Sequence, residues 1–428
     1  MTDAAKVPDE LGGLIVSPIA YARQKNLFAA FRWLRANNPI GLVEAAGFDP
    51  FWVVTKHADI LDVSSQNALF HNGDRATALI PRAADEKARA LTGGSPHPIR
   101  TIVHMDAPDH AKYRRITQAW FTQQKAKALE HRIRTIARCS VDQMAAHGRE
   151  CDFVRDVALH YPLRVIMDIL GVPAEDEPHL LRLTRDLFGT EEELLGRHAT
   201  AAVEPARHAK RLFRVLAEFQ AYFTQLADAR RQAPRDDLIS VIANAEIDGV
   251  PIQCLEATSY FVILATAGHD TTASSTSGAI WALCEDPNEF RKVKGNSALI
   301  PNLVEESVRW TTPVQHFMRT ATANTELRGR RIAKGDWLML CYLSGNRDEE
   351  AFEHPERFCV ARNLPRNVAF GHGAHVCLGQ HLARLQMGVF FEELMPRLKE
   401  IELAGEPRRS ASIFVGGPKT LPVRFRMG

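Results

Sequence analysis

The sequence FGHGAHVCLG at residues 370–379 contains three glycines, two histidines and one cysteine, and an apolar pattern with helical spacing follows it. Glycines allow a backbone to bend sharply and to lie close against a flat surface. Cys377 comes just before the expected helix, where the helix dipole and free N–H groups favour a thiolate. A thiolate presented in this way is a suitable ligand for iron.

Three interpretations of this stretch remain open from its residues alone. It can be a glycine-rich turn that ends in a buried thiol. It can be a zinc site, although zinc sites usually draw on two thiols or a histidine pair at set spacings. It can also be a haem site in which one cysteine thiolate binds the iron. The potential zinc ligands are His372, His375, Cys377 and His381.

The composition is that of an ordinary globular chain. Its 428 residues are 45% hydrophobic and 24% charged, and a net charge of +2 indicates neither nucleic acid nor a strongly acidic partner. Seven cysteines without paired spacing are typical of a reduced, cytoplasmic protein. The first apolar piece, residues 14–22, is short and contains Pro18, so we expect no signal peptide and no membrane anchor. No repeat or linker divides residues 1–428, which are expected to form one domain.

Hydrophobic spacing predicts a mainly α chain with small antiparallel sheets, an α+β fold. Near the N-terminus it predicts helices at residues 26–37 and 58–64, with a hairpin between them at residues 42–55. Residues 71–103 show little periodicity, and a connection of this length without regular structure is often functional. Further segments are expected as follows: helices through residues 123–203, a charged amphipathic helix at 204–232, antiparallel strands within 319–342, and a helix at 378–398.

A polar interruption lies inside the longest apolar-periodic run, residues 253–284, where residues 267–272 read AGHDTT. Glycine in a helix interior costs about 1 kcal/mol relative to alanine. Threonine and aspartate side chains also compete for backbone hydrogen bonds. Local disorder in a buried helix indicates a functional site, although a polar patch at a helix kink remains an alternative.

Two charged pairs at helical spacing are unspecific on their own. His110 and Arg114 share a helix face, after Asp106 as a plausible N-cap, and fit an ordinary solvated surface equally well. Glu306 and Arg309 lie three residues apart on another expected helix. Neither spacing alone assigns a function.

In combination these stretches resemble the cytochromes P450, the haem-thiolate monooxygenases. Phe-x-x-Gly-x-His-x-Cys-x-Gly at residues 370–379 matches the haem-binding signature of that family at every signature position. The interruption at 267–272 resembles its Gly-x-Asp-Thr motif. His-x-x-x-Arg at 110–114 and Glu-x-x-Arg at 306–309 also follow in family order and at family distances. The resemblance therefore covers nearly the whole chain.

The resemblance implies a haem b cofactor, iron protoporphyrin IX, with Cys377 as the axial iron ligand and four cationic side chains on the haem propionates. The implied haem-binding residues are His110, Arg114, Arg319, Phe370, Gly371, His375, Cys377 and Gly379. Glu306, Arg309 and Arg362 would support the haem loop. The family often has Asp where Cys359 stands, which is a departure beside Arg362.

For catalysis the resemblance implies that Thr271 is the hydroxyl near bound O2 and Asp270 the acid of a proton relay, with His269 structural and facing away from the iron. The substrate is expected to be small and hydrophobic, a terpene or terpene alcohol or an aromatic hydrocarbon, because the implied pocket has few polar groups. The implied pocket residues are Leu79, Ile80, Ile263, Ala267, Val314, Phe414 and Val415.

No P-loop, GxGxxG fingerprint or nucleophile elbow is present. Electrons are therefore expected from another protein, which the resemblance implies is a small acidic iron–sulfur ferredoxin with its reductase. Lys112, Arg115 and Arg384 would flank its docking site. A peroxide-driven haem enzyme and a non-catalytic haem sensor or carrier are the alternatives, but neither needs the acid–alcohol pair of Asp270 and Thr271.

Overall fold

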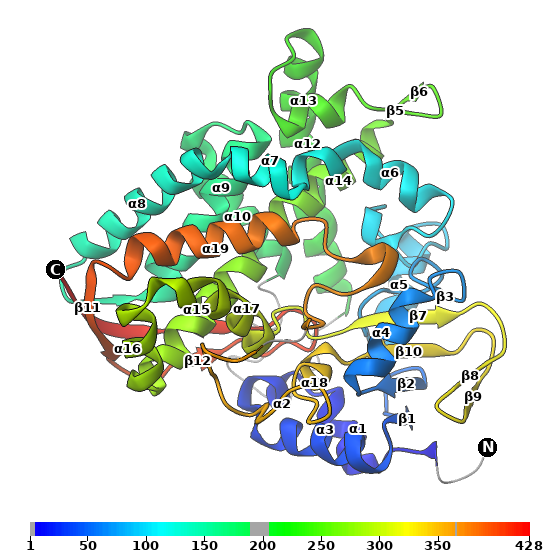
Figure 1. The fold of residues 1–428 in the computed structure, drawn as a ribbon. Helices are drawn as coiled ribbons and strands as arrows, with labels where there is room; N and C mark the ends of the chain where they lie inside the picture. The colour runs from blue at the N-terminus through cyan, green and yellow to red at the C-terminus, as the bar shows by residue number, and fades with distance from the viewer. Residues whose placement is uncertain (1–4, 189–204, 364–365) are drawn as a thin grey trace.

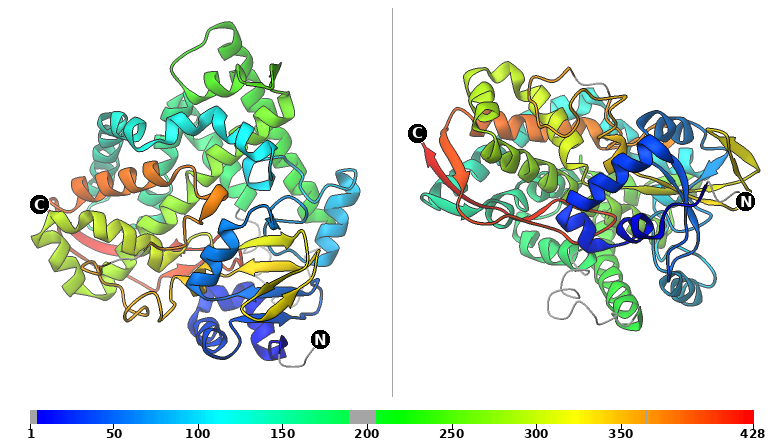
Figure 2. Two further views of the ribbon diagram at one scale, coloured as in Figure 1. Left: turned by 45° about the vertical axis from the view of Figure 1, so that its right-hand side comes forward. Right: turned by 90° about the horizontal axis from the view of Figure 1, so that it is seen from below.

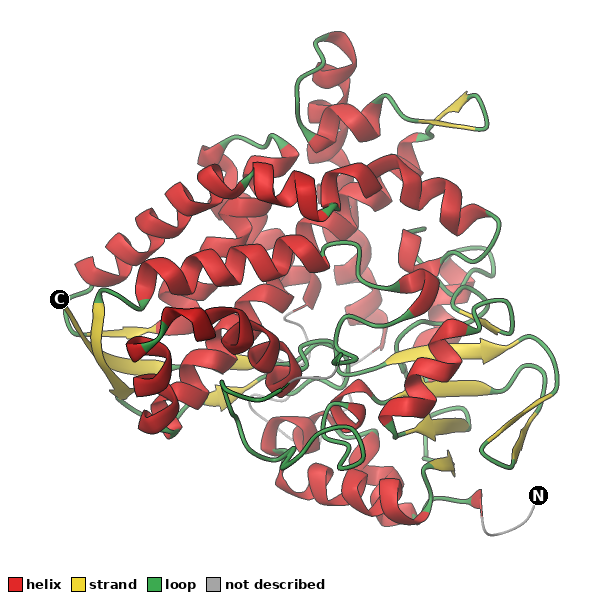
Figure 3. Ribbon diagram, in the orientation of Figure 1, coloured by secondary structure: helices red, strands yellow, loops and turns green. Residues whose placement is uncertain are grey.

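The structure, a computed structural model, describes residues 5–188, 205–363 and 366–428. Helices make up most of the described part, and the two larger sheets lie on opposite sides of the helical region (Figure 3). The two further views keep this separation (Figure 2). This arrangement confirms the expected mainly helical α+β fold.

Five α-helices and three strands precede the helix that carries the His-x-x-x-Arg motif at residues 110–114. As predicted, α3 and α4 flank the hairpin of β1 and β2, which pair antiparallel. The prediction of no regular structure throughout residues 71–103 was wrong, since α5 lies there and has no buried residue to create a periodic pattern. The helices are α1 (Asp9–Ile15), α2 (Pro18–Arg23), α3 (Lys25–Asn37), α4 (His57–Ser65) and α5 (Arg82–Leu91).

The central part of the chain is helical, as the spacing predicted. Residues 189–204, which belong to two of the predicted helices, lie outside the described residues. The predicted helix at 378–398 ends early, at Leu394, and a strand begins at Leu398. The helices are α6 (Asp109–Gln118), α7 (Gln123–Ala128), α8 (Glu130–Ala146), α9 (Tyr161–Leu170), α10 (Glu177–Phe188), α12 (Pro205–Gln232), α13 (Leu238–Ala243), α14 (Cys254–Ala267), α15 (Asp270–Glu285), α16 (Pro287–Gly295), α17 (Ile300–Thr311), α18 (Tyr342–Gly345) and α19 (Gln380–Leu394).

The larger sheet has the order β1-β2-β10-β7-β3. Its β7 and β10 pair antiparallel as expected, whereas β10 pairs parallel with β2, a long-range contact that local patterns do not predict. The strands of this sheet are β1 (Ile40–Val43), β2 (Phe51–Val54), β3 (Phe70–His71), β7 (Phe317–Ala321) and β10 (Trp337–Leu340).

The remaining strands form a three-stranded sheet, β11-β14-β4, and three two-stranded hairpins. The bounds are β4 (Glu150–Asp152), β5 (Glu246–Ile247), β6 (Val250–Pro251), β8 (Thr325–Leu327), β9 (Arg330–Ile332), β11 (Leu398–Leu403), β12 (Arg408–Arg409), β13 (Pro418–Thr420) and β14 (Pro422–Met427).

Helix α15 occupies the middle of the largest hydrophobic core and is in contact with α17, α19 and α9 (Figure 1). Most of its residues are buried, including Ala279, Ile280 and Leu283. Burial of most of its residues, including several serines and threonines, is consistent with the weak amphipathic contrast of this helix. Its N-terminal end and the loop before α19 meet at the cavity described below.

Candidate active site

An internal cavity lies between the start of α15, the loop before α19 and the first residues of β7. Its walls combine residues from stretches far apart in the sequence, and most of those implied by the family resemblance are among them. The predicted residues that line it are His110, Arg114, Ile263, Ala267, Thr271, Val314, Arg319, Phe370, Gly371, His375, Cys377 and Gly379. One cavity therefore brings together the expected haem-binding residues, Thr271 and part of the expected substrate wall.

Four predicted pocket residues do not line this cavity. Leu79 and Ile80 belong instead to the N-terminal hydrophobic cluster. The ring of Phe414 packs edge-on against Phe317, with the ring centroids 5.4 Å apart, and Val415 forms a β-bridge with Val314. Phe414 and Val415 thus contact wall residues without being among the residues that line this cavity.

The loop around Cys377 is fixed by its backbone. The N–H of Cys377 donates to the carbonyl of Phe370 at 2.8 Å, and Gly371 and Gly373 have φ values of +67° and +69°. A Cβ on Gly373 would lie 2.1 Å from the carbonyl oxygen of Ser64, at the end of α4. These constraints present the Cys377 side chain to the cavity and explain why glycine is required beside it.

The thiol of Cys377 is not activated by the protein alone. Burial raises its pKa, while the N–H of Gly379 and the charges of Arg114 and Arg384 lower the pKa by less. Desolvation therefore opposes the expected preference for a thiolate, although the Cys377 side chain itself is open to the cavity. A metal ion bound to sulfur would supply the missing stabilisation, because metal ligation releases the thiol proton.

Zinc does not fit this donor set. Within the described ranges, the only group of three or more potential ligand atoms close enough to share a metal ion is His71, Asp74 and Asp106. His372, His375, Cys377 and His381 do not form such a group. A site with a single thiolate facing a mostly apolar cavity fits haem iron instead.

The four side chains that the resemblance placed on the propionates all line the cavity, and burial lowers the pKa of both histidines among them, His110 and His375. The rings of His110 and His375 lie 4.1 Å apart between centroids, and Arg114 donates to the carbonyl of Val376 at 2.8 Å. Burial lowers the pKa of Arg319 and of Arg114. In the part of the chain that the structure describes, neither guanidinium has a carboxylate within ion-pair distance. A ligand that brings two carboxylates would offset their desolvation, and this is what haem brings.

Asp106 has a different role from the predicted N-cap. Helix α6 begins without a side-chain cap. The carboxylate of Asp106 accepts hydrogen bonds from the N–H groups of Asn72 and Gly73, at 2.9 and 2.7 Å, and lies 4.0 Å from His375. It therefore fixes the chain after β3 against the cavity wall.

The long apolar run is two helices, not one. Helix α14 ends at Ala267 and α15 begins at Asp270. The hydroxyl of Thr271 donates to the carbonyl of Ala267 at 2.8 Å, and Thr271 lines the cavity. The expected local disruption is present. Asp270 is not a lining residue, and burial raises its pKa while His269 and Arg185 lower it.

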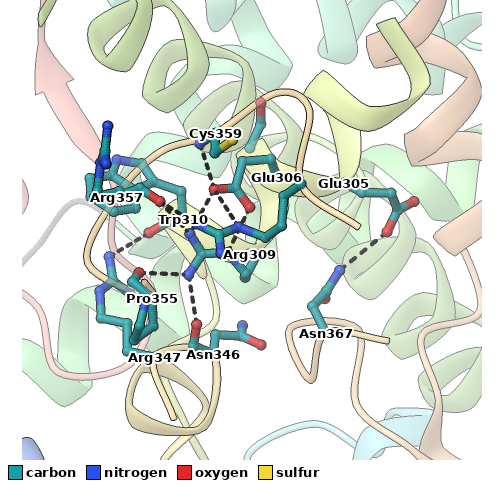
Figure 4. Close-up of polar contacts among 12 residues, drawn as sticks. Glu305, Glu306, Arg309, Trp310, Asn346, Arg347, Pro355, Arg357, Cys359 and Asn367 are labelled. Carbon is teal, nitrogen blue, oxygen red and sulfur yellow. Dashed lines mark hydrogen bonds and ion pairs between the residues drawn. The ribbon is translucent and has the colours of Figure 1, made fainter. Parts of the chain in front are cut away.

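Glu306 and Arg309 form a buried ion pair (Figure 4), and the half-buried Arg362 joins the same carboxylate. Glu306 and Arg309 are fully buried, with two contacts of 2.7 Å, and Arg362 lies 3.3 Å from the same carboxylate. The backbone N–H of Cys359 also donates to Glu306, at 2.9 Å. This position acts through its backbone, which explains why Cys can replace the Asp that is frequent in the family.

Several lining residues were missed, among them Asn72, Val103, Ile166 and Phe317. Phe317 could have been found, because it lies two residues before Arg319 on β7 and so shares its strand face. The others come from segments whose approach to the cavity depends on tertiary packing.

The three basic residues expected to flank an electron donor differ in their pairing. Lys112 forms an ion pair with Asp248, and Arg384 forms one with Glu305 while stacking over the Phe370 ring at 4.3 Å. Arg115 is exposed, and no carboxylate of the described residues lies within ion-pair distance of it. Of the three, only Arg115 keeps an uncompensated charge at the surface.

Comparison with known proteins is consistent with this geometry. Residues 76–410 match the model of the family described as Cytochrome P450. The chain is 44% identical to "Cytochrome P450-terp" from Pseudomonas sp over 99% of both chains. It is 31% identical to "Linalool 8-monooxygenase" from Pseudomonas putida, over 92% of this chain and 94% of the relative. The chain belongs to the cytochrome P450 family and is a P450 monooxygenase.

Solved structures of cytochromes P450 also superpose closely on this chain. The crystal structure of CYP108D1 from Novosphingobium aromaticivorans DSM12444 superposes with a TM-score of 0.91, at 44% identity, covering 99% of this chain and 100% of that one. A Mycobacterium marinum P450, CYP268A2 in complex with pseudoionone, gives a TM-score of 0.84 at 32% identity, with 96% of each chain covered. The resemblance to the cytochromes P450 that the sequence motifs indicated is thereby confirmed. No helix among the described residues has the length and apolar character needed to cross a membrane.

Proposed function

We propose that this chain holds haem b through the Cys377 thiolate and inserts one oxygen atom from O2 into a C–H bond of a small hydrophobic substrate. The observation that carries the proposal is the single cavity in which Cys377, the two unpaired arginines and an apolar wall come together. Haem supplies the oxygen-activating chemistry when it is bound. The protein supplies the sulfur ligand, the cations for the propionates, the walls and the protons.

The cofactor would be held from several elements. Arg114 and His110 on α6, Arg319 on β7 and His375 beside the cysteine would bind the propionates, and Phe370, Gly371 and Gly379 would shape the loop on the sulfur side. Every one of these positions lines the cavity. Charge-assisted hydrogen bonds to a buried carboxylate are about twice as strong as neutral ones, so these contacts would fix the plane and register of the macrocycle.

The substrate would bind against Ile263, Ala267, Val314 and Phe317, which are apolar and line the cavity. The relatives called Cytochrome P450-terp and Linalool 8-monooxygenase support a terpene or terpene alcohol as the substrate class. An aromatic hydrocarbon of similar size fits the same apolar wall. A hydrophobic wall distinguishes such compounds only weakly, by about 1–3 kcal/mol per methylene.

Protons would come from Asp270 by way of Thr271. Thr271 lines the cavity, and its own hydrogen is used on the Ala267 carbonyl, so its oxygen lone pairs remain free to accept from a proton carrier. Asp270 is the residue before Thr271, and burial raises the pKa of its carboxyl group. A carboxyl with a raised pKa is the type of group that serves as a general acid.

Electrons would come from a small acidic iron–sulfur ferredoxin, itself reduced by its reductase, in the cytoplasm. The exposed charge of Arg115 on α6 supports docking on the sulfur side of the cavity, since α6 also carries Arg114. The net charge of the chain is only +2, so attraction would have to be local.

The experiment is a titration of the purified haem protein with candidate substrates, followed by turnover with ferredoxin, reductase and O2. Terpene alcohols or alkylbenzenes should displace the water on iron and change its spin state, and the best binder should be hydroxylated. Equal or faster product formation with hydrogen peroxide alone would favour a peroxide-driven enzyme. Binding without any product from either system would favour a sensor or carrier.

A further inference from the structure

Behind Thr271, away from the cavity, His269 and Asp270 lie side by side where α14 gives way to α15. His269 is fully buried, and its Nδ1 lies 3.3 Å from Oδ1 of Asp270. Its Nε2 lies 2.7 Å from the carbonyl oxygen of Leu159, which follows a π-helical turn at Val154–Ala158. The ring is thus held between a carbonyl group and a carboxyl group.

The Leu159 contact settles which ring nitrogen carries hydrogen. A backbone carbonyl can only accept a hydrogen bond, so Nε2 of His269 must be the donor. In a neutral imidazole the other nitrogen, Nδ1, then has a lone pair and no hydrogen. No hydrogen-bond donor among the described residues reaches Nδ1.

That lone pair lies close to Asp270, although the ring and the carboxylate are not aligned as a hydrogen bond. If Asp270 were ionised beside a neutral His269, two hydrogen-bond acceptors would oppose each other at 3.3 Å inside the protein, which is unfavourable at low dielectric. One additional proton removes the conflict, either as a carboxylic acid that donates to Nδ1 or as an imidazolium that donates to the carboxylate.

We propose that His269 and Asp270 share one proton, and that His269 is a positioning residue that keeps this proton available behind Thr271. The proposal rests on the proposed role of Asp270 as the proton source. It adds His269 as the group that helps Asp270 regain its proton. It also changes the role expected for His269, which faces away from the cavity but is not only structural.

The electrostatic surroundings are compatible with a shared proton. Burial raises the pKa of Asp270, and the two groups that lower it are His269 and the exposed Arg185 of α10. About 18% of the Asp270 side chain is exposed, so a proton can be taken up from solvent. When one proton leaves Asp270 toward the cavity, the two lone pairs are left facing each other, which favours uptake of one proton from outside.

The first test measures the protonation of His269 and Asp270 by spectroscopy, without turnover. In the reduced, carbon-monoxide-bound holoenzyme, ring-nitrogen NMR of His269 and the infrared carbonyl band of a protonated carboxylic acid should together show one shared proton. Either the acid band appears with a neutral ring, or a charged ring appears without the band. Asp270→Asn assigns the band. A neutral ring without any acid band would overturn the proposal.

The second test asks whether the proton matters. His269→Phe keeps a buried ring and removes the proton partner, and His269→Gln is the alternative if the first variant does not fold. The turnover rate is measured against pH, and the limb that is lost in Asp270→Asn is assigned to Asp270. The apparent pKa of that limb should shift by about one unit or more in either His269 variant. Thr276→Val is the matched control, because Thr276 is a buried residue of α15 that donates to the Thr272 carbonyl.

The outcomes separate the two proposals. An unmoved pH limb in a folded His269 variant would mean that His269 is only structural. If Asp270→Asn leaves turnover unchanged while the spectra still show a shared proton, the proposed role of Asp270 as proton source fails and the proton-sharing pair remains.

Discussion

The hydroxyl of Thr271 donates a hydrogen bond to the carbonyl of Ala267 at 2.8 Å, across the gap where α14 ends and α15 begins. The carbonyl would otherwise lack its usual helical partner, because the ladder is interrupted at residues 268 and 269. The same contact turns the lone pairs of the Thr271 oxygen away from the helix. The Thr271 side chain thus caps the end of α14 and also presents hydrogen-bond acceptors to the cavity.

Thr271→Ala should uncouple reductant consumption from product. The variant should retain haem, bind substrate and consume reductant, because the hydroxyl holds none of them in place. It should yield less alcohol and more hydrogen peroxide, since the proton carrier loses its anchor. The measurement is the ratio of hydroxylated product to reductant consumed. Thr276→Val should keep the ratio, and an unchanged ratio in Thr271→Ala would mean that protons arrive by another route.

Arg319→Ala should weaken haem retention. Arg319 is buried at the cavity without an acidic partner among the described residues, so a propionate would be its main compensation. Loss of one charge-assisted hydrogen bond costs about 1.5–3 kcal/mol, or roughly 10- to 100-fold in haem affinity. Transfer of haem to apomyoglobin gives the rate of loss. Arg331→Ala, at an exposed arginine on β9 in a separate hairpin, should behave as wild type. Identical rates for Arg319→Ala and wild type would remove Arg319 from the haem site.

Glu306→Ala should destabilise the fold more than it affects chemistry at the iron. It leaves the buried guanidinium of Arg309 without its ion-pair partner and removes the acceptor for the Cys359 N–H. Breaking such a buried pair costs about 3–5 kcal/mol. Denaturant unfolding of the holoenzyme measures this cost, and Glu400→Ala, at the exposed pair with Arg426, is the control expected to change little. A loss no larger than that of the control would show that the network is dispensable.

Arg115→Glu should raise the KM for ferredoxin, with little change in substrate binding. Arg115 keeps its charge unpaired, whereas Lys112 is already neutralised by Asp248, so Lys112→Ala should have the smaller effect. Steady-state rates at increasing salt provide the second readout, because attraction between exposed charges is screened within about 10 Å at 0.1 M. Rates that do not depend on salt, together with equal effects of the two variants, would place the docking site elsewhere.

Short motifs predicted most of the site, because each is a local solution to a chemical requirement. The glycines around Cys377, the Thr271 interruption and the Glu306–Arg309 spacing are all visible in the sequence, and the structure brings their expected partners together. Leu79 and Phe414 are not among the lining residues, because distance from the cavity depends on how loops pack. No periodicity distinguishes a wall residue from the residue behind it.

Two features were not predicted from the sequence, each for a different physical reason. Helix α5 has no buried face, so its helicity comes from Ala, Arg and Glu propensity and from the Asp85–Arg89 ion pair at 2.8 Å. The pKa of Cys377 depends on burial, which outweighs the helix N-terminus that the sequence indicates. Burial depends on the tertiary environment of a residue, which is not encoded in its neighbours along the chain, whereas the signals for α5 are local and are not signals of hydrophobic burial.

The most direct test of the proposed haem-thiolate site is the absorption spectrum of the reduced protein with carbon monoxide. The wild-type protein and a Cys254→Ser control, which alters an exposed cysteine far from the cavity lining, should both show the band from which the family takes its name. Cys377→Ala should lack that band. A Cys377→Ala protein that keeps the band, or a colourless wild-type protein that contains zinc, would contradict the assignment of Cys377 as the iron ligand.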